Sequence, residues 1–196
     1  MPRTYAYSAN FDKATEKLFK DAKLLGEGHN GIVYELPEEK AIKIFQDNKC
    51  CREESDTLKK VKSEYFPKVH NTGEYYIVRD MVYGYRLDHY IKKKGFNYEL
   101  SEGLYKMLLE FKRLKFTKID ARCRDIYIGR DNEVMVIDPK QCYRKKVNYP
   151  RHLMKGLYKL GVLESFIEDL RIIDKKVANE WEKKFNNYMI ENENNI

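Results

Sequence analysis

A glycine-rich segment near the start of the chain limits the fold more than any other feature of the sequence. Gly26, Gly28 and Gly31 follow the spacing G-x-G-x-x-G, and Val33 comes two residues later. The apolar residues on both sides of the glycines predict two strands joined as a hairpin. Because glycine lacks a Cβ atom, such a loop can bring backbone N–H groups close to a ligand that larger residues would hold away.

A lysine on the next expected strand adds a positive charge to this pattern. Lys43 lies between Ile42 and Ile44, so we expect its strand to be half-buried. A buried ammonium group needs an anion, unless its aliphatic stem lets it reach water. Together, the glycine loop and Lys43 indicate phosphate binding.

The first part of the chain is expected to be rich in β-structure. Its apolar pattern predicts a five-stranded antiparallel sheet with one long helix, preceded by a shorter amphipathic helix. The expected elements are a helix at residues 10–22, strands at Lys23–Gly26, Ile32–Leu36, Ala41–Phe45, Phe66–His70 and Tyr75–Met81, and a helix at Cys51–Lys62 with Leu58 and Val61 facing inward.

From Tyr83 onwards the pattern becomes mainly helical, so we expect an α+β protein with two parts, residues 1–82 and 83–196. The expected elements are a helix that follows an N-cap at Ser101 and buries Leu104, Met107, Leu108, Phe111 and Leu114, strands at Ile126–Ile128 and Val134–Ile137, and a late helix on which Ile173, Val177, Trp181 and Phe185 step by four.

The composition is that of a soluble globular chain. Of the 196 residues, 42% are hydrophobic and 35% are charged. No apolar run approaches the roughly 20 residues of a membrane helix, and the first residues lack the apolar core of a secretory signal. We therefore expect a cytoplasmic protein with no membrane partner. The four cysteines match neither zinc-site nor disulfide-framework spacing, so we expect free thiols.

Three aspartates in the second part have a spacing that can build a metal site. Asp120 and Asp125 are five residues apart, and Asp138 follows across the short predicted hairpin. Carboxylates at the ends of short strands, with a third on the connecting loop, can converge on a cation that bridges phosphate groups.

In these motifs the chain resembles the protein-kinase-like superfamily, closest to small bacterial serine/threonine kinase-like proteins and their lipopolysaccharide-kinase and atypical-kinase relatives. The resemblance covers about Leu24 to Lys140. Gly26–Val33 matches G-x-G-x-x-G-x-V, Ala41–Lys43 matches V-A-I-K, and the aspartates match the H-R-D-x-x-x-x-N and D-F-G positions. A Rossmann loop would instead open a helix. The resemblance implies a two-lobed fold with a five-stranded N-lobe sheet plus helix and a reduced, mainly helical C-lobe.

The resemblance also implies a nucleotide site. Asp125 and Asp138 would hold Mg²⁺ or Mn²⁺ with ATP, and Asp120 would be the catalytic base, on a polar loop where it has no evident structural role. Glu54 would pair with Lys43, with Glu53 as the alternative. Arg122 would neutralise the transferred phosphoryl group, with Arg124 as the alternative. The residues implied for cofactor binding are Gly26, Glu27, Gly28, Gly31, Val33, Ala41, Lys43, Glu54, Asp80 and Val82.

Several positions depart from the kinase pattern. Lys118 and Ile119 replace the His-Arg that precedes the first aspartate, and Asp125 replaces the Asn. Pro139-Lys140 replace Phe-Gly, no Ala-Pro-Glu follows, and Arg79 occupies the gatekeeper position, where kinases usually place an apolar residue. Regulation through an activation loop is therefore not expected.

The function expected from these residues is ATP-dependent transfer of the γ-phosphoryl group to a hydroxyl, with a protein serine or threonine as the preferred acceptor. A nucleotide-binding pseudokinase and a small-molecule phosphotransferase stay open as alternatives. The formal charge of +7 and the basic run Arg144–Lys146, with Lys140 and Arg151, allow an acidic or nucleic-acid partner. Nucleic acid is not favoured, because 31 acidic residues are interleaved with the 38 basic ones.

Overall fold

The computed structural model describes residues 10–139 and 142–192. Their contacts form two compact units, Met1–Val82 and Tyr83–Ile196. The boundary falls where the apolar pattern changes from β-rich to mainly helical. In the described part of the chain the protein is α+β, with a five-stranded antiparallel sheet and seven α-helices. None of these helices combines the length and the apolar character needed to cross a membrane.

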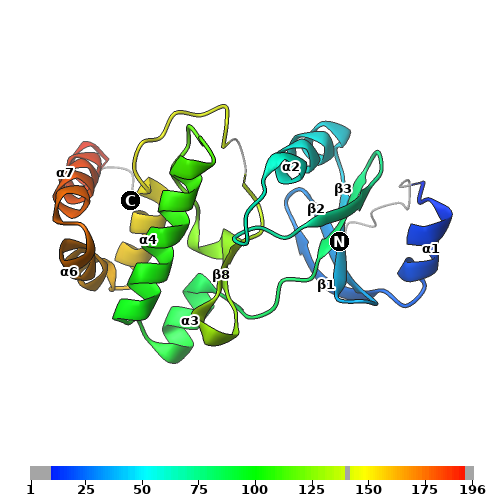
Figure 1. The fold of residues 1–196 in the computed structure, drawn as a ribbon, viewed down its shortest axis with the longest axis horizontal. Helices are drawn as coiled ribbons and strands as arrows, with labels where there is room; N and C mark the ends of the chain where they lie inside the picture. Colours follow the sequence, from blue (N-terminus) through cyan, green and yellow to red (C-terminus); the bar gives the residue numbers. More distant parts are fainter. Residues whose placement is uncertain (1–9, 140–141, 193–196) are drawn as a thin grey trace. The chain divides into compact units, whose positions relative to one another are not determined.

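The first unit is built on the five-stranded sheet (Figure 1). Its strand order is β1-β2-β3-β5-β4, and all four neighbouring pairs are antiparallel. The elements are α1 (Lys13–Phe19), β1 (Lys23–Gly28), β2 (Gly31–Leu36), β3 (Lys40–Phe45), α2 (Asn48–Lys60), β4 (Val69–Thr72) and β5 (Tyr76–Asp80).

The two faces of this sheet are covered by different helices, because successive side chains of a strand point to opposite faces. Ile42 and Ile44 belong to a cluster with Leu36, Tyr76 and Val78, against which Phe11, Leu18 and Phe19 around α1 pack. On the other face Phe45 and Ile77 pack with Cys51 of α2. This alternation places Lys43, next to Ile42 and Ile44, on the α2 face.

Both helices of the first unit begin at an aspartate N-cap. Asp12 caps α1 by accepting the N–H of Thr15 at 2.8 Å, so the helix is shorter than the expected residues 10–22. Asp47 caps α2 through the N–H of Cys50 at 2.7 Å, which starts this helix three residues early. Leu58 is buried as expected, whereas Val61 is the half-buried C-cap.

The second unit combines a small sheet with helices (Figure 1). Three antiparallel strands have the order β6-β7-β8, and the two-residue β6 was not expected from the sequence. The elements are β6 (Tyr85–Arg86), α3 (Leu87–Lys94), α4 (Tyr98–Arg113), η1 (Cys123–Asp125), β7 (Ile126–Ile128), η2 (Arg130–Asn132), β8 (Val134–Val136), α5 (Arg151–Lys159), α6 (Leu163–Ile173) and α7 (Lys175–Glu191).

Two expectations about these helices are wrong. The N-cap of α4 is Asn97, which accepts the N–H of Leu100 at 3.0 Å. Ser101 instead lies inside the helix, where its buried hydroxyl donates to Asp169 of α6 at 2.5 Å. The late helical repeat also spans two helices, because α6 ends at Ile173 and Asp174 caps α7.

Candidate functional site

The glycine segment forms the turn of the β1–β2 hairpin. Gly28 pairs with Gly31, so only His29 and Asn30 join the two strands. Gly26, Glu27 and Gly28 are exposed, Val33 is half-buried, and Ala41 is buried in β3. The structure therefore brings the glycine-loop residues together at one edge of the sheet. Their role in nucleotide binding stays a prediction.

Local structure requires glycine at only one of the three positions of the loop, Gly31. A Cβ atom at Gly31 would lie 2.0 Å from the carbonyl oxygen of Ile44, so glycine is needed there for β2 to approach β3. A Cβ at Gly26 would meet no described atom within 4 Å, and one at Gly28 only the Gly31 oxygen at 3.9 Å. Neither has the positive φ that demands glycine. Local packing thus explains Gly31 and leaves Gly26 and Gly28 unexplained.

Lys43 and Glu54 form a buried ion pair. The Lys43 Nζ lies 2.5 Å from the Glu54 carboxylate, and the side chains are 11% and 5% exposed. Lys43 belongs to the central strand β3, opposite Val33 of β2 and Ile77 of β5. Its ammonium group also lies 4.6 Å from the centre of the Phe45 ring. The structure therefore selects Glu54, rather than Glu53, as the partner of Lys43.

None of the four cysteines, Cys50, Cys51, Cys123 and Cys142, forms a disulfide. Cys51 lies one turn before Glu54 on α2, and burial raises the pKa of its thiol to about 12, with the Glu54 charge adding to the increase. A thiol with this pKa stays protonated at neutral pH, so Cys51 acts as an apolar neighbour of the ion pair.

The segment from Tyr76 to Gly84, which resembles the kinase strand and linker whose backbone groups bind adenine, begins with β5. Arg79, at the gatekeeper position, is 5% exposed. The Asp80 carboxylate accepts the N–H of Lys68 at 2.9 Å and contacts His70 Nε2 at 2.5 Å. Its side chain thus fastens β5 to the chain before and within β4. Any contact of Asp80 with adenine would therefore involve its backbone, as would that of the half-buried Val82.

In the second unit, Asp120 has a structural role that is not evident from the sequence. Its side chain is fully buried, although the residue lies in a loop. One carboxylate oxygen, Oδ1, accepts the N–H of His152 at 2.9 Å and that of Leu153 at 3.3 Å. These two groups belong to the first turn of α5, whose N-cap Pro150 offers no side-chain bond. Asp120 therefore caps α5 from a distant position in the chain.

His152 is a functional candidate that was not predicted from the sequence. Its Nδ1 contacts the other oxygen of Asp120, Oδ2, and its side chain is 35% exposed. The only sequence feature that points to His152 is its place in the first turn of a helix preceded by proline. That feature cannot reveal the partner, because 32 residues separate Asp120 from His152.

Asp125 and Asp138 lie at the same end of the β7–β8 hairpin. Ile126 pairs with Val136, and the Ile137 N–H donates to the Asp125 carbonyl at 3.0 Å. Both aspartates are half-buried. Among the described residues no group of three or more His, Cys, Asp or Glu side chains gathers as a metal site. Two carboxylates at one hairpin end nevertheless fit Mg²⁺, which usually takes one or two carboxylates together with phosphate oxygens and water.

Cys123 lies between Asp120 and Asp125 in the chain and packs against α5. Its sulfur lies 3.9 Å from the Leu153 carbonyl, and a Cβ at Gly156 of α5 would approach that sulfur to 2.3 Å. Burial raises the pKa of Cys123 to about 12, and the charges of Asp88, Asp120 and Asp125 contribute to the increase. Asp120, Asp125 and the first turns of α5 therefore lie around one thiol.

The basic residues of the prediction lie at the surface. Arg122 and Arg124 are exposed on either side of Cys123, and the Arg124 guanidinium is 3.9 Å from the Asp125 carboxylate. Arg144, Lys145 and Lys146 are exposed, and the Arg151 guanidinium stacks on Tyr188 with 5.1 Å between its carbon and the ring centre. Lys140 lies outside the described residues.

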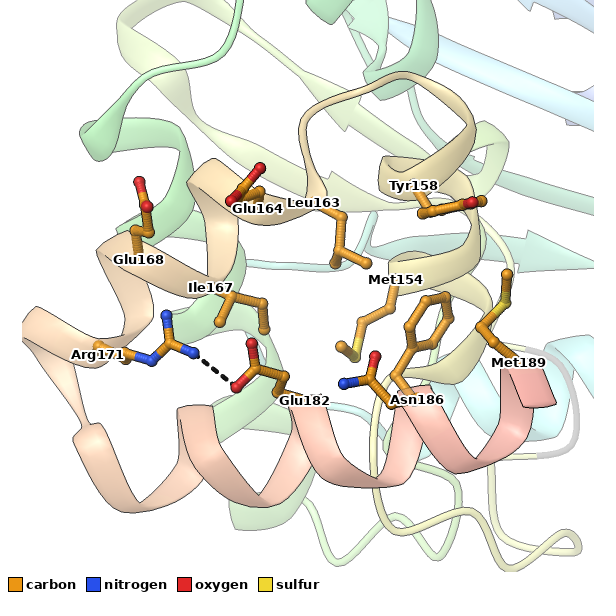
Figure 2. A pocket seen from close by; sticks show the side chains of 11 residues that line it. Met154, Tyr158, Leu163, Glu164, Ile167, Glu168, Arg171, Glu182, Asn186 and Met189 are labelled. Atoms are coloured by element: carbon orange, nitrogen blue, oxygen red, sulfur yellow. Dashed lines mark hydrogen bonds and ion pairs between the residues drawn. The ribbon is translucent and has the colours of Figure 1, made fainter.

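A groove of about 770 Å³ lies among α5, α6 and α7. In Figure 2, Met154, Leu163 and Ile167 occupy its middle, and the ion pair Arg171–Glu182, at 2.6 Å, lies at one end. None of the residues assigned to the nucleotide site lines this groove. It is therefore separate from the candidate site.

The comparisons with known proteins add no family. No family model matches the chain, and no curated protein is similar to it at a significant level.

Proposed function

We propose that the protein is an ATP-dependent phosphotransferase with a two-lobed, protein-kinase-like fold, which moves the γ-phosphoryl group of ATP to a hydroxyl. The observation that carries the proposal is the buried ion pair between Lys43 of β3 and Glu54 of α2. Protein kinases use such a pair, with lysine on the third strand and glutamate on the following helix, to position the α- and β-phosphates.

A purely structural ion pair explains this arrangement less well. Burying two charges costs several kcal/mol per ion unless further contacts compensate, and apolar residues of similar size are often at least as stable. In the first unit, Lys43 belongs to the sheet that also carries the exposed glycine hairpin. Gly26 and Gly28 have no packing reason to be glycine, whereas close approach of phosphate to the backbone would require it.

The residues that would hold the metal are Asp125 and Asp138. A bound Mg²⁺ or Mn²⁺ would neutralise charge on the β- and γ-phosphates and orient them. Arg122, exposed two residues after Asp120, would stabilise negative charge on the transferred group, with Arg124 in the same role as the alternative. Lys43 would hold the α- and β-phosphates, oriented by Glu54.

The acceptor that we propose first is a serine or threonine of a protein, in the cytoplasm. A small molecule bearing a hydroxyl is the alternative acceptor. The exposed residues Arg144, Lys145 and Lys146 offer positive charge to an acidic acceptor. Nucleic acid is a less favoured partner.

A second function, that of a nucleotide-binding pseudokinase, is favoured by one observation. The Asp120 carboxylate is fully buried, and both of its oxygens contact α5. A carboxylate in this state cannot accept a proton from an incoming hydroxyl unless α5 moves. If no other residue takes over this step, the protein would bind ATP without transferring phosphate.

Two assays on the same samples separate these functions. Calorimetry with ATP and Mg²⁺ or Mn²⁺ measures binding, and γ-labelled ATP with casein or histone as acceptor, scored also for self-labelling, measures transfer. We expect binding and transfer in the wild type and the loss of both in Asp138→Asn, which removes a metal ligand. Binding without transfer would establish the pseudokinase instead. If the protein does not bind ATP with either metal, both functions are wrong.

A further inference from the structure

The contact between Asp120 and His152 has the geometry of a carboxylate–imidazole dyad. The Asp120 side chain is fully buried, and its two oxygens contact different groups of α5. Oδ1 accepts the backbone N–H groups of His152 and Leu153, and Oδ2 contacts His152 Nδ1. Because three groups of α5 fix one carboxylate, the imidazole ring has little freedom to rotate.

This contact also determines which ring nitrogen is available. A carboxylate only accepts hydrogen bonds, so Nδ1 of His152 must carry the proton that it shares with Asp120. In the neutral ring Nε2 then has a free lone pair. The His152 side chain is 35% exposed, in contrast to the buried carboxylate. The dyad therefore holds the partly exposed His152 ring in the tautomer whose Nε2 can accept a proton.

We propose that His152 is the general base of the phosphotransferase and that Asp120 is its positioning residue. This inference rests on the proposed function. His152 Nε2 takes the proton of the acceptor hydroxyl while the hydroxyl oxygen bonds to the γ-phosphorus. At the same time the bond between the γ-phosphorus and the oxygen that bridges it to the β-phosphate breaks, which releases ADP. The imidazolium then loses the proton to water. The reaction therefore converts the hydroxyl and ATP to a phosphate ester, ADP and one proton.

The position of the dyad fits this role. Cys123, whose sulfur contacts the Leu153 carbonyl, immediately follows Arg122 and precedes Asp125 by two residues. The first turn of α5 thus lies beside the segment that carries the proposed phosphate-neutralising arginine and metal ligand. The loop before Asp120 is also held, since Ile119 N–H donates to Val147 at 2.7 Å and Val147 N–H to Thr117 at 2.9 Å.

A purely structural role for Asp120 makes a different prediction. If Asp120 served only to cap α5, the side chain of His152 would be dispensable, because the cap uses its backbone N–H. The variant His152→Ala keeps that N–H and removes only the ring. It therefore separates the base from the cap, which Asp120→Asn alone cannot do.

The test combines transfer kinetics with NMR of the histidine rings in the full chain. We expect His152→Ala to lower the transfer rate about 100-fold or more, the scale of a lost general base, with ATP–Mg²⁺ affinity unchanged. Added imidazole should restore part of the rate in His152→Ala and none in Asp138→Asn. In the wild type, ¹⁵N shifts assigned with His152→Ala should show the Nδ1–H tautomer, and Asp120→Asn should change it.

Each other outcome overturns the inference in a recognisable way. An active wild type with an equally active His152→Ala, or without imidazole rescue, leaves the phosphotransferase standing and removes His152 as its base. An Nε2–H tautomer in the active wild type also contradicts the dyad. If the wild type binds ATP but transfers no phosphate, the inference and the proposed enzyme fail together.

Discussion

Lys43 and Glu54 are opposite charges in a part of the first unit that water hardly reaches. Their side chains are 11% and 5% exposed, and the distance between Nζ and the carboxylate is 2.5 Å. In such a setting each charge depends on the other, because an isolated charge in the interior is very unfavourable. Substitution of one partner therefore affects both stability and any ligand that the pair binds, and an experiment must separate the two effects.

The first prediction makes this separation. Lys43→Met leaves the buried Glu54 carboxylate without its ammonium partner and should lower the free energy of unfolding by about 3 kcal/mol, a typical value for breaking a buried pair. The double variant Lys43→Met/Glu54→Gln removes both charges and should recover most of this loss. It should still bind ATP–Mg²⁺ poorly. Denaturant unfolding and calorimetry on the three proteins provide the check, and full ATP affinity in the double variant would exclude Lys43 from the site.

The glycines of the hairpin give a second residue-scale prediction. Gly31→Ala should destabilise the first unit by about 1–3 kcal/mol, since its Cβ would overlap the Ile44 carbonyl. Gly26→Ala and Gly28→Ala meet no such obstacle and should change stability by less than about 1 kcal/mol. If the loop covers phosphates, both should nevertheless weaken ATP binding by about tenfold or more, the effect of 1.4 kcal/mol. Thermal unfolding and calorimetry would show whether stability and affinity separate in this way.

At the scale of elements, the Asp12 carboxylate links the start of α1 to two strands of the sheet. Asp12 caps the helix through Thr15, and its Oδ2 also accepts from Asn71 Nδ2 at 2.5 Å and from the Tyr76 hydroxyl at 3.1 Å. The Thr15 N–H and the Asn71 amide are the main causes that lower the pKa of Asp12 from 3.8 to about 2. Phe11 adds an edge-to-face contact with Tyr76 at 5.0 Å.

The third prediction follows from the sign of this shift. A carboxyl whose pKa is lower in the folded state stabilises the protein above its unfolded pKa, and the contribution disappears as the pH falls through the folded pKa. The wild type should therefore melt at a higher temperature than Asp12→Ala at pH 6, and the difference should shrink between about pH 4 and pH 2. Asn71→Ala removes one partner and should move this window to higher pH. A difference that stays constant with pH would contradict the assignment.

The elements also show which features can be predicted from sequence. Local patterns suffice for the strands around Lys43, because the alternation of Ile42, Lys43 and Ile44 already places the lysine opposite its apolar neighbours. For the partner of Lys43 they leave both Glu54, four residues before the buried Leu58, and Glu53, and the structure shows that it is Glu54. Nothing local distinguishes Ser101 from a true N-cap, since its partner Asp169 is 68 residues away and on another helix.

The candidate site can likewise be predicted from the sequence only in part. The sequence identifies Asp120 by its spacing from Asp125 and Asp138, which is a property of neighbouring residues. It cannot show that Asp120 is buried, because burial depends on the packing of α5, a helix that begins 31 residues later. For the same reason it does not indicate His152, whose significance depends wholly on that contact.

For the whole molecule, the proposed function assigns different tasks to the two units. The glycine hairpin and the Lys43–Glu54 pair belong to the first unit, and the aspartates proposed to bind metal and the Asp120–His152 dyad belong to the second. Phosphoryl transfer requires phosphates, metal and acceptor to be aligned on one nucleotide. The proposal therefore requires that substitutions in either unit weaken binding of the same ligand.

The last prediction tests this requirement through the stability of the complete chain. A ligand at 100 times its dissociation constant stabilises a protein by about 2.7 kcal/mol, so ATP with Mg²⁺ should raise the melting temperature of the wild type measurably. The shift should be reduced in Lys43→Met/Glu54→Gln, which alters the first unit, and in Asp138→Asn, which alters the second. Removal of the metal with EDTA should reduce the wild-type shift but have little further effect on Asp138→Asn, because residue and ion act through the same contact. Should one variant keep the full wild-type shift, nucleotide binding would belong to the other unit alone, and the division of tasks proposed for the two units would be wrong.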